Sequence, residues 1–262
     1  MKRQVKLFDP VIDDNELRAL ERILKGKSWA DGSGSKQVKK FEEEFQKETN
    51  SDSSIAVNSG TAALYLALSM ENIQNKEVIL PSMSFVSTAH AIIANKAKPR
   101  FADIDLDTLC IDPEEIEESL SKSTRIILPV HFGGLPSDLK RIQRICRRNC
   151  LTLIEDAAHA AGASYDGKKI GSHGKFVCFS FHPVKNLAMP TGGLISINDK
   201  NYKNISKKLR AKRWCGITDR MKTKYDVKEL GWNYYMNEFS ATIGLVQLKK
   251  LKNLNKIRQK NA

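Results

Sequence analysis

The sequence predicts an α/β fold in which helices cover both faces of a mainly parallel β-sheet. Short apolar runs alternate with segments of helical periodicity along most of the chain, and this alternation is typical of the class. The 262 residues, 41% of them hydrophobic, suffice for one large buried core. No internal repeat, low-complexity tract or long linker interrupts the pattern.

The N-terminal part of the chain is predicted to be helical. Asp13 and Glu16 have the spacing of an N-capping pair. Apolar residues at helical spacing follow over residues 17–24. A Gly/Ser-rich loop, WADGSGSK at 29–36, leads to a second amphipathic helix that contains Phe41–Phe45.

Strands and helices then alternate in order. We expect strands at residues 55–57, 78–80, 126–130, 151–154, 176–181 and 194–197. We expect helices at residues 62–70, 86–94, 139–148, 203–213 and 243–257.

Composition argues against several classes of protein. No apolar stretch is long enough to span a membrane. The opening residues, MKRQVKLFDPVIDD, lack the apolar core of a secretory signal. The five cysteines show no disulfide framework, so a reducing cytoplasmic location is expected. Cys146 and Cys150 could form half of a metal site, but no second Cys or His pair lies nearby, and no metal is predicted.

The net charge of +13 is concentrated near the C-terminal end. Residues 203–262 contain 16 basic and 4 acidic residues, whereas residues 1–202 contain 27 and 26. A solvated or partner-facing helical segment accounts for this distribution, and an anionic small-molecule substrate is an alternative. No nucleic-acid-reading motif accompanies the charge, so no nucleic-acid partner is predicted.

The loop NSGTAAL follows the strand expected at 55–57. Ligands of open α/β sheets bind at the carboxyl ends of strands. The start of the next helix offers N–H groups and the positive end of its dipole to a phosphate. Gly60 permits close approach of an anion, and the Thr61 hydroxyl adds a donor. An ordinary N-cap, formed by Ser59 or Thr61, is the alternative interpretation.

Two carboxylates, Glu155 and Asp156, end the apolar run at 151–154, and His159 follows them. A buried Asp requires a cation or a hydrogen-bond donor, and a protonated pyridine nitrogen is one such partner. Adjacent residues of a strand point to opposite faces, so these carboxylates are not expected to share one ligand. Metal binding or acid–base work by paired carboxylates is one alternative, and a capping Asp before a turn is another.

Phe85 and Lys185 also follow strand ends. Phe85 could stack on a flat cofactor or belong to a core or interface. Lys185, in CFSFHPVKN, becomes a nucleophile towards carbonyls if desolvation makes it neutral, although most such lysines are solvated. Ser180 could contact a phosphate. A phosphate cradle, a stacking ring, an Asp and a Schiff-base lysine together meet the requirements of pyridoxal 5'-phosphate.

A family resemblance rests on six segments in order: NSGTAALYLAL, PSMSFVSTAHAI, HFGGLPSDL, IEDAAHAAGA, FSFHPVKNL and GWNYYMNEFSATIGLVQL. With these segments, the chain resembles the DegT-type nucleotide-sugar aminotransferases, which are pyridoxal-phosphate enzymes of fold type I. The resemblance implies a three-layer large domain with a mainly parallel mixed sheet. It divides the chain into an N-terminal helical segment (1–30), a cofactor-binding large domain (31–235) and the start of a connection (236–262) to a small C-terminal domain that is largely missing.

The resemblance also implies roles for matched residues. Lys185 matches the Schiff-base lysine, which also moves a proton between substrate and cofactor carbons. Asp156 matches the partner of the pyridine nitrogen, and Phe85 matches the stacking aromatic. His159 matches a residue near the phenolic oxygen of the cofactor. Phosphate contacts are implied for Thr61, Ala62 and Ser180.

The implied enzyme is a homodimer with shared active sites, because Asn233 matches a residue that reaches the neighbouring subunit's cofactor phosphate. The implied reaction moves an amino group, from L-glutamate, to the keto group of a nucleotide-diphosphate sugar in polysaccharide or amino-sugar biosynthesis. Two alternatives remain. One is dehydratase chemistry, in which a His replaces the lysine; Lys185 argues against it. The other is a non-catalytic fragment or regulatory relative.

Two positions depart from the family pattern. The family usually has Gly-Glu-Gly-Gly where this chain has Pro190–Gly193, so Thr191 replaces an acidic residue. Tyr235 stands where an Arg usually follows the G-x-N-Y motif. We expect these changes to affect substrate fit or dimer packing and to leave the cofactor site intact, because Lys185 and Asp156 are present.

Overall fold

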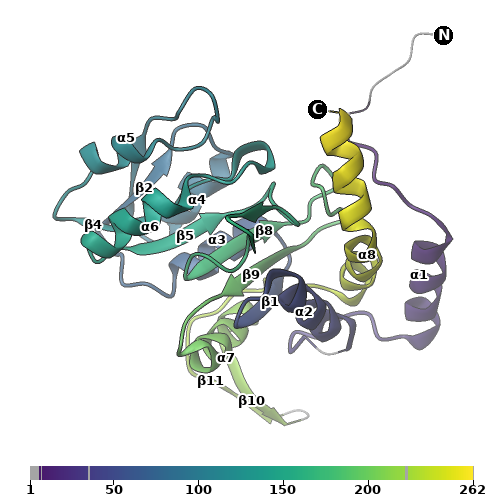
Figure 1. Cartoon of the computed structure of the whole chain (residues 1–262). Helices are drawn as coiled ribbons and strands as arrows, with labels where there is room; N and C mark the ends of the chain where they lie inside the picture. Colours follow the sequence, from purple (N-terminus) through teal and green to yellow (C-terminus); the bar gives the residue numbers. More distant parts are fainter. Residues whose placement is uncertain (1–5, 7, 35, 222–223, 262) are drawn as a thin grey trace.

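The structure is a computed structural model that describes residues 6, 8–34, 36–221 and 224–261. Within this part, the main sheet has seven strands: β1 (Ser53–Val57), β2 (Glu77–Pro81), β3 (Lys98–Ala102), β4 (Thr124–Ile127), β5 (Thr152–Asp156), β8 (Phe176–Ser180) and β9 (Gly193–Ile197). Their order across the sheet is β1-β9-β8-β5-β4-β2-β3 (Figure 1). Strand β9 runs antiparallel to β1 and β8, and the remaining neighbours are parallel. The prediction of a mainly parallel mixed sheet is confirmed.

The helices are α1 (Asp14–Gly26), α2 (Lys36–Thr49), α3 (Gly60–Leu68), α4 (Val86–Ala94), α5 (Pro113–Glu118), α6 (Leu139–Arg148), α7 (Tyr202–Arg213) and α8 (Glu238–Asn261), with a 3-10 turn η1 (Phe132–Gly134). Two short hairpins pair β6 (Ser164–Tyr165) with β7 (Lys168–Lys169), and β10 (Ile217–Met221) with β11 (Lys224–Val227).

The sheet is the middle of three layers, as the alternation of its side chains demonstrates. In β1, Ile55 and Val57 belong to the core shared with α3, α4 and α7. Ala56 points the other way, into the core shared with α2, α5 and α6. Burial on both faces explains why the strands read as continuous apolar runs in the sequence.

Aromatic packing holds α2 against the end of β8, the strand that precedes Lys185. Phe45 contacts the rings of Phe179 (4.9 Å between centroids) and Phe181 (5.4 Å). Phe41 meets Phe181 edge-on at 5.4 Å. These geometries are favourable for aromatic pairs, so the end of β8 rests on a rigid support.

Helix α1 carries the predicted capping box but packs differently from the expected apolar stripe. The Asp13 and Glu16 side chains cap the helix reciprocally. Leu17 and Leu24 are 62% and 53% exposed, whereas Glu16 is buried, 2.8 Å from Lys250 of α8. The helix stands beside α8 and away from the sheet (Figure 1). A single helix neighbour covers only part of the apolar stripe.

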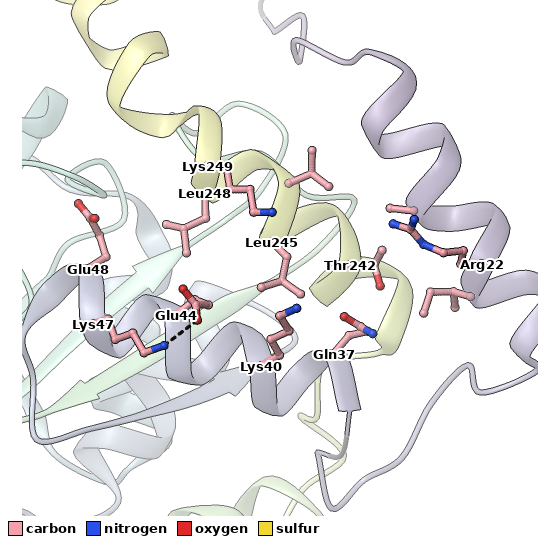
Figure 2. Close-up of a pocket in the computed structure, with 13 residues that line it drawn as sticks. Arg22, Gln37, Lys40, Glu44, Lys47, Glu48, Thr242, Leu245, Leu248 and Lys249 are labelled. Atoms are coloured by element: carbon pink, nitrogen blue, oxygen red, sulfur yellow. Dashed lines mark hydrogen bonds and ion pairs between the residues drawn. The ribbon is translucent and has the colours of Figure 1, made fainter.

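A hollow of about 820 Å³ lies between α1, α2 and α8 (Figure 2). Arg22, Lys40 and Thr242 are among its lining residues, and each belongs to a different one of the three helices. No described lining residue of this hollow comes from a strand end. It is therefore separate from the edge of the sheet at which ligands of α/β folds bind.

The sequence did not predict β3, α5 or the hairpins. Strand β3 reads KPRFA and lies at the edge of the sheet, where Lys98 and Phe101 are exposed. Such a strand lacks the apolar signature of a buried strand. Among the described helices, none is long and apolar enough to cross a membrane.

Candidate active site

A cavity of about 400 Å³ opens where β5 and β8 end and α3 begins. The structure brings together seven of the nine residues that the sequence predicts for the site. They are Gly60, Thr61, Phe85, Asp156, His159, Ser180 and Lys185. These residues come from four separate loops, and only the fold makes them neighbours.

The other two predicted residues, Ala62 and Asn233, do not line this cavity. Ala62 is buried in α3, and its amide donates to the Ser59 hydroxyl at 3.1 Å. Asn233 is exposed, and its carbonyl accepts from the Asn58 side chain at 3.3 Å. The predicted role of Asn233 concerns the site of a second subunit, so its position outside this cavity neither supports nor contradicts that role.

The turn before α3 is packed so closely that only glycine fits it. A Cβ atom added to Gly60 would lie 2.7 Å from the Cβ of Ser180, too near for any real pair of carbons. Ser59 is the N-cap of the helix, as the alternative interpretation expected. The Ser59 cap is compatible with anion binding, because it uses one of several N–H donors at the helix start.

Asp156 and Glu155 point to opposite sides of β5, as expected. Asp156 lines the cavity, and its carboxylate accepts from the Ala158 amide (3.1 Å) and from the Thr88 hydroxyl (2.8 Å). Glu155 is fully buried behind the cavity. It contacts the His131 imidazole at 2.8 Å and accepts from the Gly174 amide.

Two residues that contact these carboxylates, His131 and Thr88, were not predicted from the sequence. His131 lies within the segment HFGG, and its Nδ1 accepts from the Ser137 amide at 3.1 Å. The ring therefore carries its proton on Nε2 and donates it to Glu155. In the sequence, His131 and Thr88 are marked only by their positions near the ends of strands. Such a position does not reveal that their partners are Glu155 and Asp156.

Lys185 is half-buried and shares the cavity with Asp156 and His159. Desolvation lowers the pKa of Lys185, and the negative charge of Asp156 opposes that shift. Desolvation also lowers the pKa of His159, with a smaller contribution from the charge of Lys185. Both groups are thus biased towards their neutral forms, in which an amine can act as a nucleophile.

His159 is oriented by a backbone donor. Its Nδ1 atom lies 3.2 Å from the Gly133 amide, which donates to it. The neutral ring consequently carries its proton on Nε2. His159 can therefore offer one N–H to an oxygen in the cavity.

Phe85 lies at the rim of the cavity with 72% of its surface exposed. It is the N-cap residue of α4, and its ring makes no core contact of the kind seen for Phe41. Within this chain, the interpretation of Phe85 as a core residue is wrong. An exposed ring beside a cavity is suited to cover a flat ligand.

The two departures from the family pattern leave the reactive residues in place. Thr191 lines the cavity, and its hydroxyl donates to the Asn58 carbonyl at 2.5 Å. Tyr235 is half-buried and does not line the cavity. Thr191 therefore ties the loop before β9 to the turn before α3.

The cavity residues fit pyridoxal 5'-phosphate. The glycine-containing turn and Ser180 suit its phosphate, and the two are so close that a Cβ at Gly60 would collide with Ser180. Asp156 supplies an acceptor for a ring nitrogen, and Phe85 supplies a stacking surface. Lys185 supplies a desolvated amine for the aldehyde carbon.

Comparison with known proteins identifies relatives over nearly the whole chain. The model of the DegT/DnrJ/EryC1/StrS aminotransferase family matches residues 10–262. An uncharacterized protein of Methanocaldococcus jannaschii is 38% identical over 264 residues, which cover 97% of this chain and 67% of that protein. The spore coat polysaccharide biosynthesis protein SpsC of Bacillus subtilis is 36% identical over 262 residues, covering 97% of this chain and 66% of its own length.

Solved structures also match nearly the whole chain. Helicobacter pylori PseC, an aminotransferase involved in the biosynthesis of pseudoaminic acid, matches with a TM-score of 0.90 and 26% identity, over 95% of this chain and 66% of that one. The synthase of 3-amino-5-hydroxybenzoic acid matches with a TM-score of 0.90 and 32% identity, over 97% and 66% respectively.

The chain spans about two thirds of the length of these relatives. The matches confirm the resemblance inferred from the six sequence segments and the predicted fold type. The chain belongs to the DegT/DnrJ/EryC1/StrS aminotransferase family, whose members are pyridoxal-phosphate-dependent transaminases of fold type I.

Proposed function

We propose that this protein transfers an amino group from L-glutamate to the keto group of a nucleotide-diphosphate sugar. The reaction takes place in the cytoplasm and contributes to cell-surface polysaccharide or amino-sugar biosynthesis. Family membership supports the transaminase chemistry, and relatives named for spore coat polysaccharide and pseudoaminic acid biosynthesis support the sugar acceptor. The observation that carries the proposal is the half-buried Lys185 amine in one cavity with Asp156 and the turn before α3.

Each residue of the cavity has a separate role in the proposed reaction. When bound, the cofactor supplies a ring that withdraws electrons from the substrate carbon. Lys185 would hold the cofactor's aldehyde carbon and move a proton at its own Nζ atom. The Asp156 carboxylate would accept from the ring nitrogen, and Phe85 would cover the ring. Gly60, Thr61 and Ser180 would bind the phosphate, and the Nε2 proton of His159 would be donated to the phenolic oxygen.

Two copies of the chain share their active sites in this proposal. Asn233 is exposed, so that its side chain is accessible to a second subunit. In the proposed dimer it would contact the phosphate held by that subunit. The exposed apolar residues Leu230 and Trp232 lie beside it in the chain. Exposed apolar residues favour a contact with another protein surface where they form a patch.

Cofactor attachment is tested with the Lys185→Ala variant. Addition of pyridoxal phosphate to the wild-type protein is expected to produce an absorbance band near the visible edge, and the variant is expected to lack it. Lys168→Ala, which removes an exposed lysine, serves as the matched control and should retain the band. Absence of the band in the wild-type protein would overturn the proposed enzyme function.

The substrate class is tested with a panel of nucleotide ketosugars and L-glutamate. We expect 2-oxoglutarate and an aminated sugar nucleotide to form in equal amounts, and mass spectrometry detects both products. A sugar product without added nitrogen would instead indicate dehydratase chemistry. If the cofactor band forms but no ketosugar is aminated, the sugar acceptor is wrong while the cofactor assignment stands.

A further inference from the structure

A chain of two hydroxyl groups lies behind Asp156. Thr88 is fully buried in α4, and its Oγ1 lies 2.8 Å from Oδ2 of Asp156. The Ser84 hydroxyl lies 2.6 Å from the same Thr88 oxygen. These contacts connect the loop after β2 with the end of β5, across 68 residues of sequence between Thr88 and Asp156.

The chemistry of the groups fixes the direction of both hydrogen bonds. An ionised carboxylate can only accept, so the Thr88 hydroxyl must donate its one proton to Asp156. Thr88 must then accept from Ser84, which donates across the shorter contact. Hydrogen bonds arranged head to tail in this way strengthen one another in a buried environment.

Thr88 does not have the ordinary role of a threonine within a helix. Such a hydroxyl commonly bonds the backbone carbonyl one turn earlier, whereas this hydroxyl donates to Asp156. The second oxygen of Asp156 accepts from the Ala158 amide at 3.1 Å. Each carboxylate oxygen thus has a fixed donor, and the two hydrogen bonds set the plane of the group.

The start of α4 carries both Thr88 and Phe85, whose ring lies at the rim of the cavity. Phe85 is the N-cap residue of α4, and its carbonyl accepts from the Thr88 amide at 3.0 Å. A movement of this helix start would displace Phe85 and the donor to Asp156 together. The first turn of α4 therefore supports both Phe85, which is suited to contact the face of a flat cofactor ring, and Asp156, which is suited to contact its edge.

We propose that Thr88, supported by the hydrogen bond from Ser84, is a positioning residue that fixes the orientation of the Asp156 carboxylate towards the ring nitrogen of the cofactor. This inference rests on the proposed function. Thr88 does not line the cavity itself and acts only through Asp156.

The Thr88→Val variant tests the proposal, because valine has nearly the same shape and no hydroxyl. We expect the dissociation constant for pyridoxal phosphate, measured by absorbance titration, to rise about tenfold. We also expect the pH midpoint of the bound cofactor's absorbance to move upward, because a ring nitrogen held less firmly in its protonated form withdraws fewer electrons. Thr88→Ser restores the hydroxyl and should recover at least most of both properties.

Thr242→Val is the matched control, since Thr242 is also buried in a helix and donates to the Glu238 carbonyl at 2.7 Å. It should change thermal stability without changing the cofactor's affinity or spectrum. If Thr88→Val does not fold, Ser84→Ala provides the test, with an expected increase in the dissociation constant of about twofold to threefold.

Wild-type affinity and an unchanged pH midpoint in the Thr88→Val variant, or in Ser84→Ala if the former does not fold, would overturn the positioning role. The same conclusion follows if Thr88→Ser behaves like Thr88→Val. A wild-type protein that binds no cofactor would overturn the proposed function itself, so the two failures are distinguishable.

Discussion

Lys185 acquires its special character from its surroundings, because its sequence position also suits a solvated lysine at a strand end. The structure places it half-buried in the cavity, and desolvation lowers its pKa. Asp156 is the opposing influence, since its negative charge stabilises the ammonium form. The balance leaves a neutral amine available at lower pH than for an ordinary lysine.

This balance predicts the pH dependence of Lys185 acylation in the protein without cofactor. Only the neutral amine reacts, so a lowered pKa moves the half-maximal rate to lower pH than at the exposed Lys122. Asp156→Asn removes the charge that raises the pKa of Lys185, and should move the midpoint further down. Competitive acylation followed by mass spectrometry measures both midpoints. Equal midpoints at Lys185 and Lys122 would contradict this account.

At the scale of elements, the start of α3 is the most constrained part of the site. Its turn packs against the ends of β8 and β9, where Gly60 and Gly193 leave no room for a Cβ. The helix dipole and the N–H groups of its first turn point towards the cavity. The same close packing that excludes a side chain therefore permits an anion to approach the backbone.

Gly60→Ala should weaken binding of pyridoxal phosphate by about tenfold to a hundredfold, because the added Cβ displaces the turn or Ser180. Gly26→Ala is the matched control, since nothing lies within 4 Å of a Cβ added at that position. Isothermal titration of both variants measures the difference. Unchanged affinity in Gly60→Ala would place the phosphate elsewhere.

At the scale of the whole molecule, a buried ion pair joins distant parts of the chain. Arg213 of α7 is fully buried and donates to Glu42 of α2 at 2.9 Å. The same guanidinium donates to the Ala56 carbonyl of β1 (2.9 Å) and the Ser33 carbonyl (2.9 Å). The N-terminal loop, the edge of the sheet and α7 are therefore held by one side chain.

Glu42→Ala is expected to destabilise the fold by about 3–5 kcal/mol, because it removes the carboxylate to which the buried Arg213 guanidinium donates. Glu44→Ala on the same helix removes only an exposed partner of Lys47, drawn as a dashed contact in Figure 2. That control should leave stability unchanged, as is usual for surface pairs. Urea denaturation gives both values, and equal midpoints for the two variants would refute the role of the buried pair.

Much of the fold could be predicted because its signals are local. Buried strands such as β1 and β8 are continuous apolar runs, and α4 and α6 have the bounds expected from periodicity. Strand β3 could not be predicted, because an exposed edge strand has no such pattern. The exposure of Leu17 could not be predicted either, since it depends on how few elements pack against α1.

The sequence by itself determined the chemistry available to this protein. The order of Gly60, Phe85, Asp156 and Lys185, each after a strand or at a helix start, indicated the cofactor and the family. These residues are recognisable because their types, their order and their positions at strand ends or helix starts can be read from the sequence.

Only the tertiary structure decided which of these groups meet and what supports them. It turned Glu155 away from the cavity towards His131, desolvated Lys185, and placed the Thr88 hydroxyl against Asp156. The physical reason is that burial and hydrogen bonding depend on neighbours far away in the chain. No local pattern around Thr88 encodes a partner 68 residues later.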